Sequence, residues 1–219
     1  MVARHADRSV GGVTAQPNPV WRQLYRAGGI SAFLATAAYI VALLLDFTVP
    51  AAPESGGAAV LEYIAAHRTV YILEQILWLA PSVLLMVVFL ALWLALKEVN
   101  RSYAAIGGVL GIASWAVTLA YPATGGGAPA LVSLSDRYLA AATAAERASF
   151  AAAAEGFIAL NTVPTMVGVL ETIAILILSL VMLRGAVGRR VAYLGVVTGA
   201  AGIVCESLKP VLGLGYITY

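Results

Sequence analysis

The sequence is dominated by long apolar stretches that are separated by short polar segments. A helix that crosses a hydrocarbon core of about 30 Å needs about 20 mostly apolar residues. Five stretches are long enough, and they cover residues 28–49, 70–96, 103–121, 161–183 and 191–208. None of them alternates apolar and polar residues with a period of two, as the strands of a membrane barrel do. The pattern therefore predicts an all-α transmembrane bundle of five spans.

Two further segments are predicted to be helices that do not cross the membrane. In residues 55–67, apolar side chains recur at helical spacing after Ser55, a residue type suited to an N-cap. In residues 134–156, the spacing Ser133-x-x-Asp136 predicts a capping box before an Ala-rich helix. The second segment carries too many charges for a span: Asp136, Arg137, Glu146, Arg147 and Glu155. We expect both helices to lie on the outer face of the bundle.

The positions of the basic residues predict the orientation of the bundle. Nine of the 13 Lys and Arg residues fall before the first span or in the second and fourth connections: Arg4, Arg8, Arg22, Arg26, Lys97, Arg101, Arg184, Arg189 and Arg190. The other four fall on the opposite side: Arg68, Arg137, Arg147 and Lys209. The positive-inside rule then makes residues 1–26 a cytoplasmic tail and places the C-terminus outside. Residues 27–219 are predicted to form a single transmembrane domain.

The overall composition agrees with a membrane protein and excludes several other classes. Hydrophobic residues make up 61% of the 219 positions, charged residues 11%, and the mean hydropathy is +0.90. An ordinary soluble domain has about 45–50% apolar and about 25% charged residues. The net charge of +2 is too small for a surface that attracts nucleic acids, and the single Cys205 excludes a disulfide scaffold. The lipid bilayer is therefore the one partner that composition predicts.

The third and fifth spans begin alike, which suggests a weak internal repeat. Six identical residues recur at a constant offset between residues 101–113 and 189–201. Both segments contain a G-x-x-x-G motif, formed by Gly107 and Gly111 and by Gly195 and Gly199. Small residues four positions apart let helices approach closely. The favoured interpretation is close packing inside the bundle, with a dimer interface as the alternative; whether the repeat is a true duplication stays open.

Four acidic residues fall inside predicted spans, where a charge at the helix centre costs about 2.5–3.5 kcal/mol. Glu171 is predicted to lie about 15 Å from the start of its span, near the middle of the membrane. Asp46, Glu74 and Glu206 fall in the outer thirds of theirs. Lys209 follows Glu206 by three residues on one helix, so the two can pair. These five residues are the candidate ligand- or ion-binding residues.

The candidate residues admit functional and structural interpretations. Glu171 either binds a proton, a cation or a ligand, or is a neutral side chain that bonds across helices; the others either bind a ligand or extend to the interface. Together they predict a polar cavity open to the outside. The leading hypothesis is a non-enzymatic protein that binds a small ligand, a lipid or a partner subunit. The alternatives are a small transporter or proton-coupled conduit using Glu171, and an intramembrane enzyme with Glu171 and Glu74 as acid and base.

Motifs for cofactor chemistry are missing from the sequence. It has no G-x-x-x-x-G-K phosphate-binding loop and no H-E-x-x-H zinc motif. The two histidines, His5 and His67, are far apart, so paired-histidine ligation of haem or zinc has no candidate. We therefore predict no cofactor, no metal and no catalytic residue.

Three short segments carry a resemblance to a known family. They are residues 90–107, which include Trp93, Lys97 and Arg101, residues 26–30, and the join between residues 183 and 195. Together they resemble a family of small bacterial multi-pass membrane proteins described as a domain of unknown function. The resemblance covers most of the chain from about Arg26 onward. It implies a helical protein of the bacterial plasma (inner) membrane, and it implies no activity that could assign residues a role.

Overall fold

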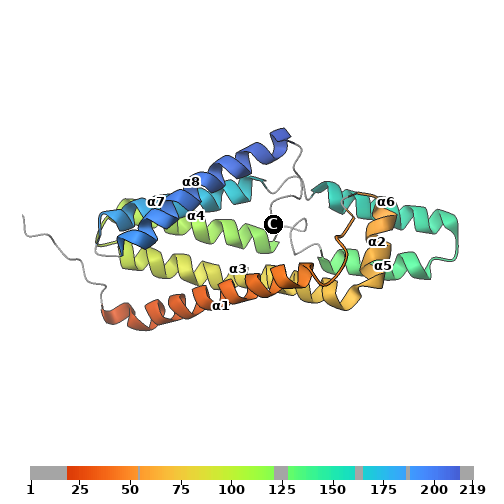
Figure 1. Ribbon diagram of the computed structural model, residues 1–219, viewed down its shortest axis with the longest axis horizontal. Helices are drawn as coiled ribbons and strands as arrows, with labels where there is room; N and C mark the ends of the chain where they lie inside the picture. Colours follow the sequence, from red (N-terminus) through yellow and green to blue (C-terminus); the bar gives the residue numbers. More distant parts are fainter. Residues whose placement is uncertain (1–18, 54, 121–127, 161–164, 186–187, 213–219) are drawn as a thin grey trace, which may run out of the picture.

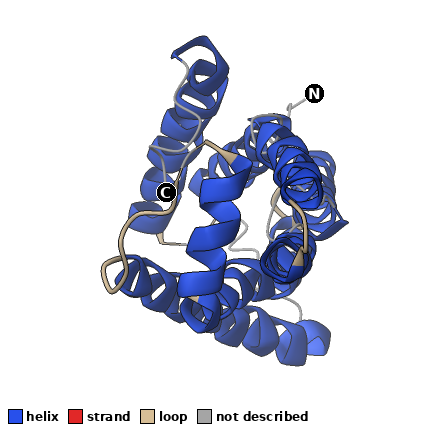
Figure 2. Cartoon of the chain, turned by 90° about the vertical axis from the view of Figure 1, so that its right-hand side faces the viewer, coloured by secondary structure: helices blue, strands red, loops and turns tan. Residues whose placement is uncertain are grey.

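The structure is a computed structural model that describes residues 19–53, 55–120, 128–160, 165–185 and 188–212. All regular elements among these residues are helices. Figure 2 shows the helices and their connecting loops from one end of the molecule. The predicted all-α class is confirmed for the described part of the chain.

Five long helices lie side by side and form a bundle (Figure 1). They are α1 (Arg22–Asp46), α3 (Arg68–Leu96), α4 (Arg101–Ala120), α7 (Thr165–Leu183) and α8 (Arg189–Leu212). The main contacts of the bundle join α1 to α3, α3 to α4, α4 to α7, and α7 to α8. Four segments are long and apolar enough to cross a membrane: Pro19–Asp46, Arg68–Leu96, Arg101–Ala120 and Arg189–Leu208. The chain therefore has the character of a membrane protein with at least four candidate spans.

The first helix extends further toward the N-terminus than its apolar stretch predicts. α1 begins at Arg22, inside the predicted tail of residues 1–26, and ends at Asp46. Its first turns lie against the end of α3, where the Tyr25 hydroxyl donates a hydrogen bond to the Leu94 carbonyl at 3.5 Å. Tertiary contact therefore sets where this helix begins. Residues 1–18 of the predicted tail lie outside the described residues.

Three shorter helices form a cap over one end of the bundle, and we call them the cap (Figure 1). They are α2 (Gly57–Ala66), α5 (Ala128–Ala140) and α6 (Ala144–Leu160). The cap has an apolar cluster of its own, made by Val60, Leu61, Ile64, Leu131 and Ala154. Both α2 and α5 contact α3. With 29 residues, α3 is about 44 Å long, so its first turns project beyond a 30 Å hydrocarbon core and support the cap.

The prediction of one helix over residues 134–156 is wrong, because the chain makes two helices there. α5 ends at Ala140, and α6 begins at Ala144. The Glu146 carboxylate accepts hydrogen bonds from the backbone N–H groups of Ala142 (2.9 Å) and Thr143 (3.2 Å). In return, the Glu146 N–H donates to the Thr143 hydroxyl at 3.2 Å. This reciprocal pair is a capping box, and it starts the second helix.

The capping box predicted at Ser133 is also wrong. Ser133 lies inside α5, and Asp136 forms an ion pair with Arg68 at the start of α3. Two residues further on, the Tyr138 hydroxyl donates a hydrogen bond to the Glu62 carboxylate at 2.9 Å. This hydrogen bond stabilises the neutral phenol and raises the pKa of Tyr138 above its usual value. The polar residues of α5 therefore join it to α3 and α2.

The N-cap of α2 is Gly56 and not Ser55, the residue predicted for that position. Gly56 has a φ of 89°, a left-handed conformation that residues with a Cβ rarely adopt. The next residue, Gly57, donates its backbone N–H to the Glu155 carboxylate of α6 at 2.6 Å. A distant side chain therefore satisfies the start of α2, an arrangement that local sequence does not reveal.

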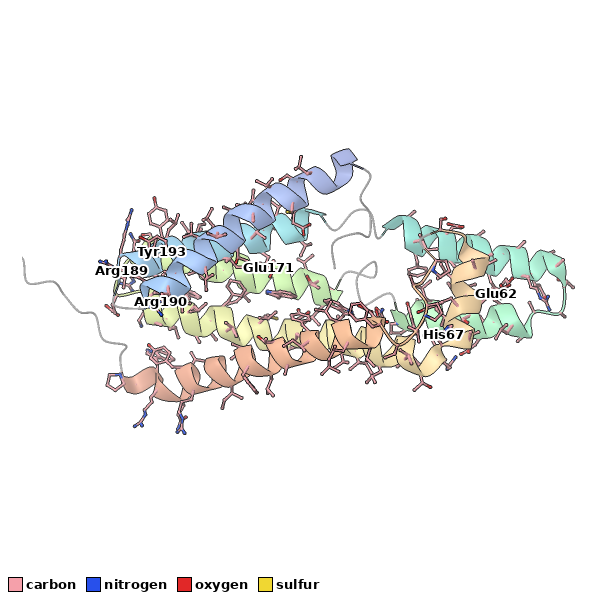
Figure 3. The ribbon with its side chains drawn as sticks, in the orientation of Figure 1. Glu62, His67, Glu171, Arg189, Arg190 and Tyr193 are labelled. Atoms are coloured by element: carbon pink, nitrogen blue, oxygen red, sulfur yellow. The ribbon has the colours of Figure 1, made fainter. Side chains whose placement is uncertain are left out.

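Basic residues gather at the end of the bundle opposite the cap. Figure 3 shows Arg189 and Arg190 there, at the start of α8. Seven of the nine basic residues predicted to share one side are described, and all belong to this end: Arg22, Arg26, Lys97, Arg101, Arg184, Arg189 and Arg190. Arg68, Arg137 and Arg147 lie in the cap or beside it. The predicted separation of charge along the bundle is therefore present in the described residues.

Both G-x-x-x-G motifs pack against neighbouring helices of the same chain, as the favoured interpretation predicted. At each position a Cβ would come too close to a neighbour: Gly107 to Leu178, Gly111 to Phe89, Gly195 to Ser179 and Gly199 to Leu176. The first motif lets α4 approach α3 and α7, and the second lets α8 approach α7. These glycines set how closely the helices of the bundle pack.

Gly199→Ala should destabilise the bundle by about 1–3 kcal/mol, as overpacking does. The new Cβ would lie 2.8 Å from the backbone nitrogen of Leu176, and a backbone atom cannot rotate away. Gly29→Ala is the matched control, because no atom lies within 4 Å of its Cβ position. Thermal unfolding in detergent measures both. Equal unfolding temperatures for the two variants would contradict a close α7–α8 contact at Gly199.

Candidate functional site

The four acidic residues predicted inside spans lie in two pairs, and each pair joins two neighbouring helices. Asp46 at the end of α1 contacts Glu74 of α3. Glu171 of α7 has the carboxyl group of Glu206 in α8 as its acidic neighbour. The structure therefore brings the candidates together two by two, across α1–α3 and across α7–α8.

The two pairs lie at different heights along the bundle. Counted from the basic end at 1.5 Å per residue, Glu171 lies about 18 Å from the end of α7 at Leu183. By the same count Glu74 lies about 33 Å from the end of α3 at Leu96. A layer 30 Å thick, the thickness of a hydrocarbon core, measured from the basic end would contain Glu171 and would end near Glu74. A separation of about 15 Å along the axis means that one small head group does not contact both pairs.

The outer pair belongs to a cluster of aromatic and acidic side chains where α1, α2 and α3 meet. Glu74 is in hydrogen-bonding contact with both Asp46 and the Trp78 indole. The Trp78 ring centroid lies 5.3 Å from that of Tyr39 on α1. The Glu74 carboxyl group therefore meets Asp46 of α1 and the indole of its own helix at one point. Burial, together with the charges of Glu74 and Asp46, raises the pKa of Tyr63 on α2.

The inner pair depends on a glycine. The Glu206 carboxyl group packs against Gly168 of α7, where an added Cβ would lie 2.6 Å from the Glu206 Cδ. Thr172 donates its hydroxyl to the Gly168 carbonyl at 2.9 Å and keeps this part of α7 compact. Gly168 thus leaves space for Glu206 one turn from Glu171. The side chain of Lys209 lies outside the described residues, so its pairing with Glu206 stays a prediction.

A groove of about 190 Å³ runs between α3 and α7, and Glu171 lies at the end nearest the cap. Figure 3 marks Glu171 partway along the bundle, between the basic end and the cap. The groove is lined by Leu85, Val88, Phe89 and Leu92 of α3 and by Glu171, Ile175, Leu178, Ser179 and Met182 of α7. Apart from Glu171 and Ser179, every lining side chain is apolar. This arrangement suits an apolar molecule with one polar end.

A second, more open hollow of about 340 Å³ lies at the junction of α2 and α3 and is lined by residues 65–70. His67 is part of it and stacks on Tyr63 with ring centroids 4.7 Å apart. Its Nδ1 lies 3.2 Å from the Tyr63 carbonyl. Within the described residues, no three His, Cys, Asp or Glu side chains are grouped as metal ligands are.

Sequence reasoning missed three residues of these sites: Trp78, Tyr63 and Gly168. Trp78 follows Glu74 by four residues, the spacing at which helix side chains meet, so this neighbour was readable from sequence. Gly168 lies three residues before Glu171, on the same helix face, so its place beside Glu171 was also readable. Tyr63 gave no such signal, and neither did the contact of Gly168 with Glu206. Their roles arise because α2 folds back onto α3 and α8 packs onto α7.

Comparison with known proteins assigns no function to this chain. No protein-family model, curated protein or solved structure matches this chain. The resemblance to small bacterial multi-pass membrane proteins therefore stays a prediction. A helical bundle by itself does not specify an activity, so function has to be argued from the geometry of the site.

Glu74→Leu should destabilise the protein by about 0.5–1.5 kcal/mol, because the Asp46 carboxyl group and the Trp78 indole would lose their shared partner. Glu74→Gln keeps a side chain that donates and accepts hydrogen bonds, so it should cost less than half as much. Thermal unfolding in detergent, followed through tryptophan emission, measures both. If Leu and Gln at this position are equally tolerated, the hydrogen bonds of the outer pair do not contribute to stability.

Proposed function

We propose that this chain is a five-span protein of the bacterial plasma membrane that binds a lipid or a small apolar ligand between α3 and α7. One observation carries the proposal: a carboxyl group, Glu171, lies at one end of an otherwise nearly apolar, partly open groove between two helices of the bundle. Charged groups in a membrane interior are costly, so such a group marks a functional site. The groove provides apolar surface for a ligand, and Glu171 provides the polar contact that orients it.

The packing of α7 supports a fifth span. The helix has 19 residues, about 28 Å at 1.5 Å per residue, which lies within the range of membrane spans. It packs between α4 and α8, two of the candidate spans. The clustering of basic residues at one end supports an orientation with that end, and with it the N-terminus, in the cytoplasm.

Fusion reporters distinguish five spans from four. With five spans and a cytoplasmic N-terminus, green fluorescent protein at the N-terminus should fluoresce, and alkaline phosphatase at the C-terminus should be active. Four spans would place both ends on one side, so the C-terminal phosphatase would then be inactive. A phosphatase fused after Lys97 is the control and should be inactive, because the α3–α4 turn lies at the basic end. Activity of that control fusion would contradict the proposed orientation.

Binding fits the groove better than covalent catalysis does. Glu171 and Ser179 are the two polar side chains of the lining. They are eight residues apart on α7, which corresponds to about 12 Å along the helix. A nucleophile and its base must lie within hydrogen-bonding reach of each other, at about 3 Å. The two side chains therefore do not form such a pair.

Val88→Trp should displace the ligand, because Val88 lines the groove and the indole would fill it. Val83→Trp is the matched control: it lies on the same helix, does not line the groove, and its side chain is 54% exposed. Native mass spectrometry of protein purified in nanodiscs should show a bound small molecule or lipid on the wild type and on Val83→Trp. It should show at least tenfold less on Val88→Trp.

Equal occupancy in the two tryptophan variants would contradict binding in the groove. A stoichiometric protein partner that Val88→Trp releases would instead favour a role as a subunit of a complex. Proton flux in liposomes that Glu171→Gln abolishes and Val88→Trp leaves unchanged would favour the conduit.

A further inference from the structure

We infer that the ligand is a single-chain amphiphile with a protonated amine head group, bound with its head at Glu171 and its alkyl chain along the groove. This inference rests on the proposed function and specifies the class of ligand. Three features of the molecule carry it: the charge at the end of the groove, the unpaired polar atoms near it and the apolar length beyond it.

The ionisable side chains described near the head position are acidic. Glu171 lines the groove, and Glu206 is its acidic neighbour. No Lys, Arg or His side chain lines the groove. In the described part of the chain Glu171 forms no ion pair, and Arg184, the nearest basic residue along its own helix, is 13 residues or about 20 Å away. A cationic head group favours the ionised form of Glu171 and pairs with it, whereas a carboxylate or phosphate would be repelled by that form.

Two buried polar atoms of the neighbouring helices lack a hydrogen-bond partner among the described residues: the Ser82 hydroxyl oxygen of α3 and the Trp115 indole nitrogen of α4. Neither residue lines the groove, but Ser82 lies three residues before Leu85, the first α3 residue of the lining. Packing contacts fix their height. Phe89 of α3 packs on Gly111, and Leu178 of α7 packs on Gly107.

Gly107 and Leu178 lie at the same height. Toward the cap, Trp115 is eight residues from Gly107 and Glu171 is seven residues from Leu178, so at 1.5 Å per residue their heights differ by about 2 Å. Ser82 lies about one helical turn further toward the cap. Buried polar atoms are rarely left without a partner, so polar groups gathered at one level favour a polar head group there. A protonated amine donates three hydrogen bonds, which the Glu171 carboxylate and the Ser82 hydroxyl can accept. The Trp115 indole N–H is itself a donor, so it does not pair with the amine.

The rest of the groove suits an unbranched chain. From Glu171 to Met182 it extends 11 residues along α7, which is about 16 Å. The facing side chains of α3 are aliphatic or aromatic, from Leu85 to Leu92. A narrow apolar groove between two helices accommodates an alkyl chain that runs parallel to the helices, with its end toward the basic end of the bundle. The head group then lies nearer the cap.

Three probes of equal chain length test the inference: dodecylamine, dodecanol and dodecanoate, titrated into protein held in zwitterionic nanodiscs. We expect the amine to bind at least tenfold more tightly than the alcohol, and the carboxylate to bind more weakly than the alcohol. Glu171→Gln should remove the preference for the amine and keep binding of the alcohol, which also shows that the variant is folded. Glu98→Gln, an exposed carboxyl group at the basic end, should keep the preference. Val88→Trp should lose all three probes.

The outcomes separate the inference from the proposed function. If the wild type binds the alcohol and the amine equally well, or if Glu171→Gln keeps the preference for the amine, the inferred head group is wrong while the groove remains a binding site. If none of the probes binds to the wild type, both the inference and the proposed function are overturned. A preference that Glu98→Gln abolishes equally would locate the charge effect away from the groove and would overturn the inference.

Discussion

The bundle depends on the close approach of helices at small residues. Lipid tails are as apolar as leucine side chains, so the hydrophobic effect does not bring spans together, and contact between well-fitting surfaces must do so. Glycines of α4 and α8 accept Phe89, Leu178, Ser179 and the backbone at Leu176 at distances that a Cβ would forbid. This contact places α7 between α4 and α8. It also positions Glu171 beside α3 and beside Glu206.

The same packing separates the polar groups of the molecule by height. Basic residues occupy one end, Glu171 and Glu206 lie within the bundle, and Asp46 and Glu74 lie where α1 and α3 meet the cap. Each of these four acids has another acid as its neighbour on an adjacent helix. The cap covers the end of the bundle near the outer pair, and Tyr63 of α2 extends the contacts of that pair. Of the four acids, only Glu171 is among the described residues that line the groove.

Most elements of the fold follow from the apolar pattern, because each long apolar stretch can satisfy its backbone in lipid only as a helix. The ends of the helices follow less well. α1 begins before its apolar stretch because Tyr25 bonds to α3, and Gly57 at the start of α2 is satisfied by Glu155 of α6. The break at Thr143 was readable, since Thr143-x-x-Glu146 is a capping box within an otherwise uniform Ala-rich segment.

The sequence by itself determined that the chain is helical, that it suits a membrane, and which acidic residues lie at costly positions. Such properties depend on residue type and on spacing along one helix, which are local. Only the tertiary structure decided that Asp46 pairs with Glu74 and Glu171 with Glu206, and that a groove opens between α3 and α7. These features depend on which faces of separate helices meet. That choice is made by the fit between distant surfaces, and no local pattern encodes it.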